Sequence, residues 1–372
     1  MGATLVSRII AVYRVTGEAA SIEARAQAIA LEQSIEAPLA AVRDEFVRRE
    51  IVGGVGAIRE LGPGRFEIEI GLSAATVGDD AGQLLNMLFG NSSLQPDVEL
   101  VDFRLPDEVI AGFPGPGRGI AGLRARVGAP SRALTCVAIK PQGLPPASLA
   151  ALTQALALGG VDFIKDDHGF ADQGYSPFAA RVAANAAACR RAAERTGRLA
   201  CYVPVLYGHY GLMRDQIAIA RDHGIDAVMI APMIAGLATA QAISAENRDL
   251  IVFAHPTMGG AARIAPPALM RLFRLVGGDV GVFPNYGGRF GYSKETCLAL
   301  AEGLRTSWGA LKDTMPTPAG GMTTARVAEM LEVYGDDTML LIGGALLSAP
   351  PEQLVAETAA FAAAVRPSEG KR

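Results

Sequence analysis

GGVDFIKDDHG, residues 159–169, is an apolar run that ends abruptly in charged residues. The segment VDFI is typical of a buried strand, and Lys165, Asp166, Asp167 and His168 follow it without a break. The chain has only five lysines and four histidines, so this concentration is unusual. Because side chains alternate along a strand, Lys165 and Asp167 share one face while Asp166 takes the other. The stretch predicts a strand whose carboxyl end carries functional side chains.

The same pattern of a short apolar run followed by an amphipathic stretch recurs through the rest of the chain. Eight such runs over roughly 240 residues are the count expected for a (β/α)8 TIM barrel. A doubly wound open sheet is the alternative, although no run is followed by the GxGxxG of a dinucleotide site. We expect the barrel strands at 135–140, 161–167, 200–206, 226–232, 250–256, 279–285, 313–319 and 338–344.

The amino-terminal part has a different texture. Residues 5–15 and the alternating segment 66–73 are typical of strands, whereas 21–34 and 82–91 are typical of helices. A Gly- and Pro-rich connection follows at 113–130. We therefore expect an α+β domain over residues 1–115 and the TIM barrel over residues 116–372.

Composition excludes several classes of partner. Half of the 372 residues are apolar and the net charge is −4, which is typical of a globular protein and argues against a nucleic-acid partner. The sequence has no run of 18 apolar residues, so we expect no membrane-spanning helix. Four scattered cysteines without a CxxC pair are typical of small buried residues in a reducing compartment, so we expect a cytoplasmic protein.

Polar and glycine residues gather at the ends of the expected strands, where barrel enzymes carry their catalytic groups. The glycine pairs expose backbone N–H groups that can hold a phosphate. A lysine ammonium is a poor metal ligand, but a carbamate formed with carbon dioxide would add oxygen donors of the kind Mg²⁺ prefers. The residues concerned are Lys140, Lys165, Asp167, His168, His255, Asn285, Gly320, Gly321, Gly343 and Gly344.

The ordered motifs resemble those of the RuBisCO large chain. GGVDFIKDDH resembles the activating-lysine motif of that family, and AIKPQGL (138–144), NMLFGNSSL (86–94), AGG (319–321) and IGG (342–344) resemble others. The resemblance implies a ferredoxin-like α+β domain followed by a barrel. It also implies an antiparallel homodimer, in which the amino-terminal domain of one subunit completes the active site of the other.

The resemblance also implies roles for individual residues. Lys165 would carry the carbamate and bind Mg²⁺ together with Asp167 and His168, and Lys140 would act as acid and base. His255 would be a further site residue, while Glu32 and Asn91 would come from the neighbouring subunit. One phosphate would be held by Gly320, Gly321, Gly343 and Gly344, and Arg289 lies where the family has a mobile-loop lysine.

Departures from the family pattern argue against carbon fixation. His168 replaces a ligand glutamate, and Gln142, Pro256 and Val282 replace a lysine, an arginine and a histidine. Since phosphate binding depends on charged donors, we expect a substrate with one phosphate. The pattern is similar to that of the form IV RuBisCO-like proteins, in their non-photosynthetic branch.

For these proteins we expect chemistry through a metal-stabilised enediolate. We rank decarboxylation of a phosphorylated 3-oxo sugar acid, of the 3-oxo-isoapionate 4-phosphate type, first. The alternatives are a ketose-phosphate tautomerase or isomerase of the enolase type and a non-catalytic sugar-phosphate binding protein. Plainer readings also remain: a buried salt bridge at Lys165, a surface role for His168, a core role for His255 and simple turns at the glycine pairs.

Overall fold

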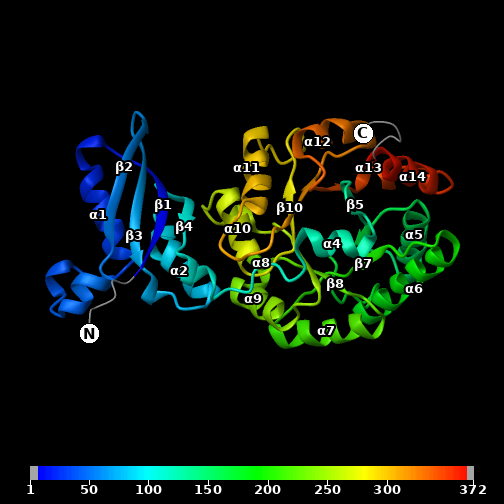
Figure 1. The fold of residues 1–372 in the computed structure, drawn as a ribbon, viewed down its shortest axis with the longest axis horizontal. Helices are drawn as coiled ribbons and strands as arrows, with labels where there is room; N and C mark the ends of the chain where they lie inside the picture. The colour runs from blue at the N-terminus through cyan, green and yellow to red at the C-terminus, as the bar shows by residue number, and fades with distance from the viewer. Residues whose placement is uncertain (1–6, 367–372) are drawn as a thin grey trace.

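A computed structural model describes residues 7–366 of the chain. The amino-terminal domain is a four-stranded antiparallel sheet in the order β2-β3-β1-β4, with two main helices in the connections (Figure 1). This βαββαβ arrangement confirms the ferredoxin-like expectation. Its elements are β1 (Arg8–Thr16), α1 (Ile22–Glu32), β2 (Gly54–Gly62), β3 (Arg65–Ser73), α2 (Ala81–Phe89) and β4 (Val98–Arg104).

The core of this domain follows from the alternation in β3. Phe66, Ile68, Ile70 and Leu72 are all buried on one face, and α1 packs against the sheet. The edge strand β2 was not expected from the sequence, since most of its side chains are exposed and it has no apolar face to give a period of two. The other edge strand, β4, was also missed.

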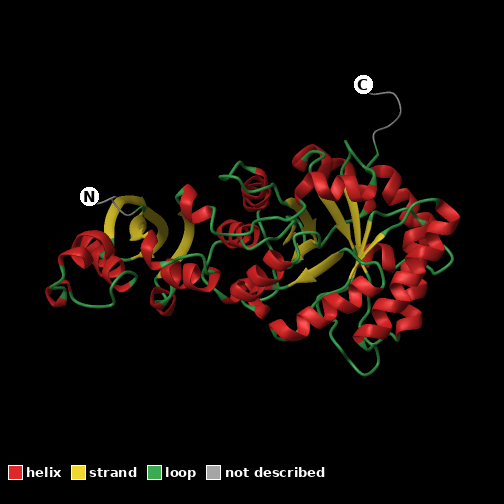
Figure 2. Ribbon diagram, turned by 60° about the horizontal axis from the view of Figure 1, so that its bottom comes forward, coloured by secondary structure: helices red, strands yellow, loops and turns green. Residues whose placement is uncertain are grey.

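The second sheet is an eight-stranded parallel barrel in the order β7-β6-β5-β12-β11-β10-β9-β8, ringed by helices (Figure 2). Each strand overlaps one of the eight expected runs. The bridge between Val205 and Met229 closes the ring between β7 and β8. The TIM-barrel expectation is therefore confirmed. The strands are β5 (Leu134–Ala138), β6 (Phe163–Lys165), β7 (Cys201–Val203), β8 (Ala227–Ile230), β9 (Ile251–Ala254), β10 (Val280–Pro284), β11 (Met315–Ala319) and β12 (Met339–Ile342).

Helices cover the outside of the barrel, and a side chain caps the first turn of two of those described. Ser293 accepts a hydrogen bond from Thr296 N at the start of α11, and His209 accepts one from Leu212 N at the start of α7. His209 is thus a capping residue. The helices are α3 (Asp107–Ile110), α4 (Gly119–Val127), α5 (Pro146–Leu158), α6 (Phe178–Thr196), α7 (Tyr210–Asp222), α8 (Pro232–Ala235), α9 (Leu237–Glu246), α10 (Pro266–Leu275), α11 (Lys294–Arg305), α12 (Val327–Tyr334), α13 (Gly344–Leu347) and α14 (Leu354–Ala364).

An aromatic pair inside the barrel shows which residues of β6 and β9 face inward. Phe163 of β6 and Phe253 of β9 lie on strands that are not neighbours, yet their ring centroids are 5.6 Å apart. They can meet only across the barrel interior. Because alternate residues share a face, Lys165 and His255, each two residues further on, also face inward above this pair.

The two domains contact each other through α2 with α9 and through β4 with α10. The side chain of Gln241 accepts a hydrogen bond from Ala81 N at 2.8 Å and so holds the start of α2. The boundary near residue 115 stays a prediction. Over residues 7–366, no helix is long and apolar enough to cross a membrane, and the four cysteines are free and buried.

Candidate active site at the carboxyl end of the barrel

The structure brings five of the expected residues together at the carboxyl end of the barrel. Lys165 ends β6, Asp167 and His168 follow it, Lys140 follows β5 and His255 follows β9. All of them are coupled through ion pairs, ring contacts or mutual charge effects. Segments more than 100 residues apart in sequence therefore form one cluster.

Lys165 is a buried amine, with 2% of its surface exposed. Its Nζ donates a hydrogen bond to the backbone oxygen of Asp166 at 2.8 Å. Burial lowers the pKa of Lys165, against smaller opposing effects from Cys136 and Asp167. Among residues 7–366 it forms no ion pair, so the reading of a plain buried salt bridge at Lys165 is not supported.

Asp167 is the anionic centre of the cluster. Its Oδ1 lies 3.0 Å from Lys140 Nζ and 3.5 Å from His168 Nδ1. Burial alone would raise the pKa of Asp167, but the hydrogen bonds from His168 and Lys140 outweigh it and hold this pKa well below its usual range. A permanent carboxylate at this place is a suitable ligand or anchor for a cation.

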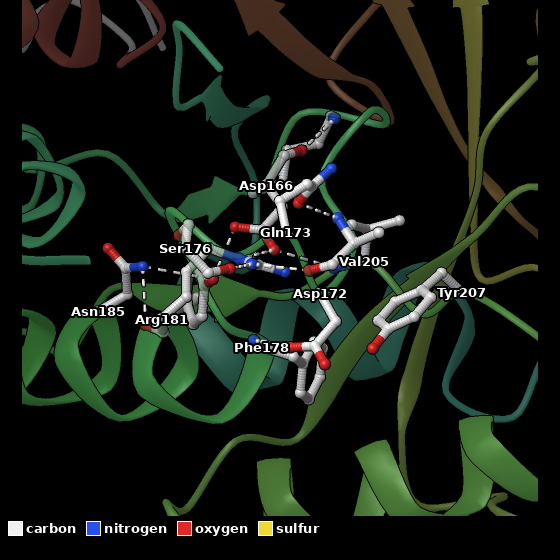
Figure 3. A network of polar contacts seen from close by, with 12 residues as sticks. Asp166, Asp172, Gln173, Ser176, Phe178, Arg181, Asn185, Val205 and Tyr207 are labelled. Atoms are coloured by element: carbon white, nitrogen blue, oxygen red, sulfur yellow. Dashed lines mark hydrogen bonds and ion pairs between the residues drawn. The ribbon is translucent and has the colours of Figure 1, made fainter. Parts of the chain in front are cut away.

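Asp166 points away from the barrel interior and belongs to a separate structural network (Figure 3). It accepts hydrogen bonds from Arg181 Nε at 3.1 Å, from Tyr202 OH at 2.6 Å and from Val205 N at 3.2 Å. Burial raises the pKa of Asp166 and the Arg181 guanidinium opposes this rise. The opposite orientation of Asp166 agrees with the strand alternation expected from the sequence.

His168 and His255 stack at the mouth, with ring centroids 4.7 Å apart and planes tilted by 12°. Burial lowers the pKa of His255 well below its usual value, and the positive charges of Lys165 and His168 add to this effect. Thr257, which the sequence did not single out, contacts the His255 ring through its hydroxyl at 2.5 Å and its backbone N–H at 3.3 Å.

The two glycine pairs lie on neighbouring strands. Gly320 and Gly321 have φ of +80° and +67°, which a residue with a Cβ rarely adopts, and they follow β11. The register of β11 with β12 places them beside Gly343 and Gly344. A Cβ added at Gly343 or Gly344 would meet no atom within 4 Å, so open space borders this backbone.

Two arginines lie near the glycine pairs. Arg289 is exposed and its guanidinium lies over the Phe290 ring at 4.8 Å, and no polar contact joins it to the glycine pairs in residues 7–366. Arg326, which the sequence did not single out, donates to Tyr286 O at 3.2 Å and Gly321 O at 3.5 Å. The Arg326 guanidinium also forms an ion pair with Glu329 at 3.0 Å, so the arginine beside the glycine backbone is charge-paired.

Glu32 and Asn91 form a separate site in the amino-terminal domain. Asn91 Nδ2 donates to Glu32 Oε1 at 2.8 Å, and both line a hollow of about 240 Å³. Helix α1, which ends at Glu32, lies on the side of the domain away from its own barrel (Figure 1). Gln33, missed in the sequence, is buried and bonds to Met87 O at 2.8 Å and to Ser92 N at 3.0 Å.

The donor set for a metal is incomplete without the lysine. Within the described part of the chain, no three His, Cys, Asp or Glu side chains converge to hold a metal ion. Asp167 and His168 provide two donors, and the third expected ligand, Lys165, is a buried amine. Binding of a metal ion at this place would therefore depend on whether the Lys165 amine carries a carbamate.

The chain is similar in sequence to several known proteins. The profile described as ribulose bisphosphate carboxylase large chain, catalytic domain, matches residues 119–280. A protein of Rhodospirillum rubrum named 5-methylthioribulose-1-phosphate isomerase is 55% identical over 97% of this chain and 97% of its own length. A 2,3-diketo-5-methylthiopentyl-1-phosphate enolase of Geobacillus kaustophilus is 31% identical over 96% of this chain and 92% of its own.

Solved structures have the same fold. A Rubisco-like protein from Rhodopseudomonas palustris matches with a TM-score of 0.91 and 50% identity, covering 98% of this chain and 99% of that one. The octameric ribulose-1,5-bisphosphate carboxylase/oxygenase of Pyrococcus horikoshii matches with a TM-score of 0.90 and 24% identity, covering 96% of this chain and 87% of that one. The latter similarity concerns the fold alone.

Proposed function

The chain belongs to the RuBisCO large-chain family, in its RuBisCO-like branch, and we propose that it is an isomerase of a monophosphorylated ketose acting through an enediolate. The observation that carries this proposal is the cluster of Lys140, Lys165, Asp167, His168 and His255 at one barrel mouth. The relatives bear isomerase and enolase names, which favours proton transfer over the decarboxylation ranked first from the sequence.

The surroundings of the mouth support a substrate with one phosphate. The glycine pairs offer backbone N–H groups to a phosphate on one side, and Arg326, which is ion-paired with Glu329, lies beside them. On the side of β9 and β10, Pro256 and Val282 stand where the family has an arginine and a histidine, and neither side chain can donate a hydrogen bond to a phosphate. An uncharged end of the substrate is compatible with these two residues.

Lys165, once carbamylated, would hold a divalent cation together with Asp167 and His168. The buried amine fits this role because burial favours its neutral form, which is the form that reacts with carbon dioxide. Carbamate and carboxylate oxygens suit Mg²⁺, while the His168 imidazole is a donor that transition metals also accept. When bound, the cation would polarise the substrate carbonyl and stabilise the enediolate.

The other side chains would move the proton and orient the substrate. Isomerisation removes a proton from a carbon beside the carbonyl and returns one to the neighbouring carbon. Lys140, partly exposed at the mouth and paired with Asp167, is placed to exchange that proton with substrate. His255 would contact a substrate oxygen. Glu32 and Asn91 would complete the site from a partner subunit in a homodimer.

Turnover in deuterated water tests this function. Purified protein is incubated with Mg²⁺ or Mn²⁺, bicarbonate and 5-methylthioribulose 1-phosphate, and products are followed by NMR. We expect an isomer carrying solvent deuterium and no release of carbon dioxide. Binding without deuterium exchange would support a non-catalytic binding protein. Carbon dioxide released from a phosphorylated 3-oxo acid would support the decarboxylase instead.

Dependence on carbon dioxide tests the metal site separately. We expect Mn²⁺ to bind, as measured by its paramagnetic relaxation of water, only after the protein has been equilibrated with bicarbonate. Lys165→Met should abolish this binding, whereas Lys312→Met should not, because Lys312 lies before β11 at the opposite end of the barrel. Equal binding by both variants would rule out Lys165 as a metal ligand.

A further inference from the structure

The loop after β9 turns back on His255 through a tight turn, Pro256–Gly259. Gly259 N donates to Pro256 O at 2.8 Å, and Met258 has φ +65° and ψ +1°. A positive φ at the third residue is typical of a type II turn, in which glycine is preferred. Met258 therefore holds a strained conformation, and strain of this kind is found where a loop positions functional groups.

Thr257 is the second residue of this turn and directs two groups at one nitrogen of His255. Its backbone N–H lies 3.3 Å from Nδ1, and its hydroxyl oxygen lies 2.5 Å from the same atom. An amide N–H can only donate, so Nδ1 must present its lone pair. The hydroxyl, which can donate or accept, then also acts as a donor to Nδ1.

The other ring nitrogen is left for the active site. A neutral imidazole that accepts at Nδ1 carries its proton at Nε2. Within residues 7–366, Nε2 of His255 has no hydrogen-bond partner, and the charges acting on the ring are those of Lys165, Asp167, Lys140 and His168. The free edge of the ring is thus available to a ligand beside the cluster.

We propose that Thr257 is a positioning residue that holds His255 as its Nε2–H tautomer. The ring then donates a hydrogen bond to an oxygen of the bound ligand and does not accept a proton from it. This second statement rests on the proposed isomerase function, because an enediolate oxygen is the acceptor that the donor would stabilise. The tautomer itself requires no substrate.

Nitrogen NMR of the resting protein tests the tautomer directly. The chain has four histidines, and ring-¹⁵N labelling with a His255→Gln variant assigns the resonances of this one. We expect the Nδ1 signal in the far-downfield position of an unprotonated nitrogen and the Nε2 signal in the protonated range. An Nδ1 that carries the proton would overturn the proposal.

Variants of Thr257 test whether this residue imposes the tautomer. Thr257→Pro removes the hydroxyl and the N–H together, at a turn position that accepts proline. We expect the two ring nitrogens of His255 to move to averaged positions, as in a mixture of tautomers. Thr257→Ser keeps both donors and should give the wild-type spectrum. An unchanged spectrum in Thr257→Pro would show that another group sets the tautomer.

Thr257→Val provides a second route if the proline variant does not fold. Valine has a similar shape and keeps the backbone N–H but lacks the hydroxyl. The Nδ1 resonance should therefore shift part of the way toward the averaged position expected in Thr257→Pro. With the ketose phosphate as substrate, kcat should fall about ten-fold while KM changes less, and Thr257→Ser should restore it. A Nδ1 resonance and kcat both unchanged in Thr257→Val would count against a role for the hydroxyl.

The spectra and the assay separate the two proposals. A wild-type spectrum with Nε2–H but no turnover of any ketose phosphate leaves the positioning role standing and refutes the isomerase. Turnover with deuterium exchange in a protein whose Nδ1 is protonated leaves the isomerase standing and refutes the positioning role.

Discussion

The two ends of β6 carry buried ionisable residues with very different numbers of partners. At the amino end, buried Asp162 accepts hydrogen bonds from Arg132 at 2.7 Å, from Arg198 at 3.1 Å and from Thr135 N at 2.9 Å. At the carboxyl end, buried Lys165 has, among residues 7–366, only a backbone oxygen as partner. One end of the strand is saturated with partners, and the other keeps a reactive group without a counter-ion.

The difference separates stability from function within a single strand. Buried charges normally have complete sets of partners, because an unpaired one costs free energy. The amino end of the barrel meets this rule. Asp279, for instance, accepts from the backbone N–H groups of Arg118, Gly119 and Val252. The carboxyl end breaks the rule at Lys165, as expected where a ligand or a modification supplies the missing interactions.

The largest effect is expected from Lys165→Met. Loss of the carbamate site should lower kcat/KM by more than about 10³-fold, because both the cation and its charge stabilisation are lost. The free energy of unfolding should stay the same or rise, since a buried amine without a counter-ion is replaced by an apolar chain of similar length. Steady-state kinetics and urea unfolding check both parts. A marked destabilisation would mean that Lys165 is structural.

Asp162→Ala should produce the reverse pattern. It leaves Arg132 and Arg198 without their shared carboxylate, so the free energy of unfolding should fall by about 3–5 kcal/mol. The fraction that stays folded should keep its kcat, because this end of β6 is remote from the mouth. Urea titration with active-site counting measures both. A selective loss of kcat would contradict the division between the two ends.

Gln33→Ala should combine the two kinds of effect. It removes partners from the buried Met87 O and Ser92 N and should cost about 1–3 kcal/mol of unfolding free energy. Because Asn91 is adjacent to Ser92, kcat should fall as well. Mixed dimers of Gln33→Ala with Lys165→Met can be compared with mixed dimers of Asn91→Ala with Lys165→Met. Lower activity in the first pair would mean that Gln33 also supports the barrel of its own subunit. We expect equal recovery.

Met258→Gly should give the smallest effect and provides a control for the turn beside His255. Glycine accepts φ of +65° without strain, and the Met258 side chain is largely exposed, so unfolding free energy should rise by about 0.5–1 kcal/mol. The tautomer of His255 should be unchanged, since Thr257 is intact. Thermal unfolding and the ¹⁵N spectrum measure these outcomes, and a destabilised variant would contradict the assignment of strain.

Much of the site could be predicted because it follows local rules. Lys165, Asp167 and His255 were identified from their places at strand ends, and the structure gathers them. Thr257, Arg326 and Gln33 could not be found in this way. Each acts through a hydrogen bond that depends on a turn or on packing between segments. Neither hydrophobic periodicity nor a family-like motif marks any of the three residues. Strand β2 was missed because an exposed edge strand has no apolar face.

The sequence by itself determined the eight strands of the barrel, the alternation that separates Lys165 from Asp166, and the order of residues at the strand ends. These features depend on the order of apolar and polar residues close together along the chain, and the hydrophobic periodicity of the sequence shows that order directly. Only the tertiary structure decided that Phe163 meets Phe253, that His168 stacks on His255 and that Thr257 holds one nitrogen of the ring. Such contacts depend on closure of the barrel and on loop conformation, which bring together groups whose separation along the chain has no regular period.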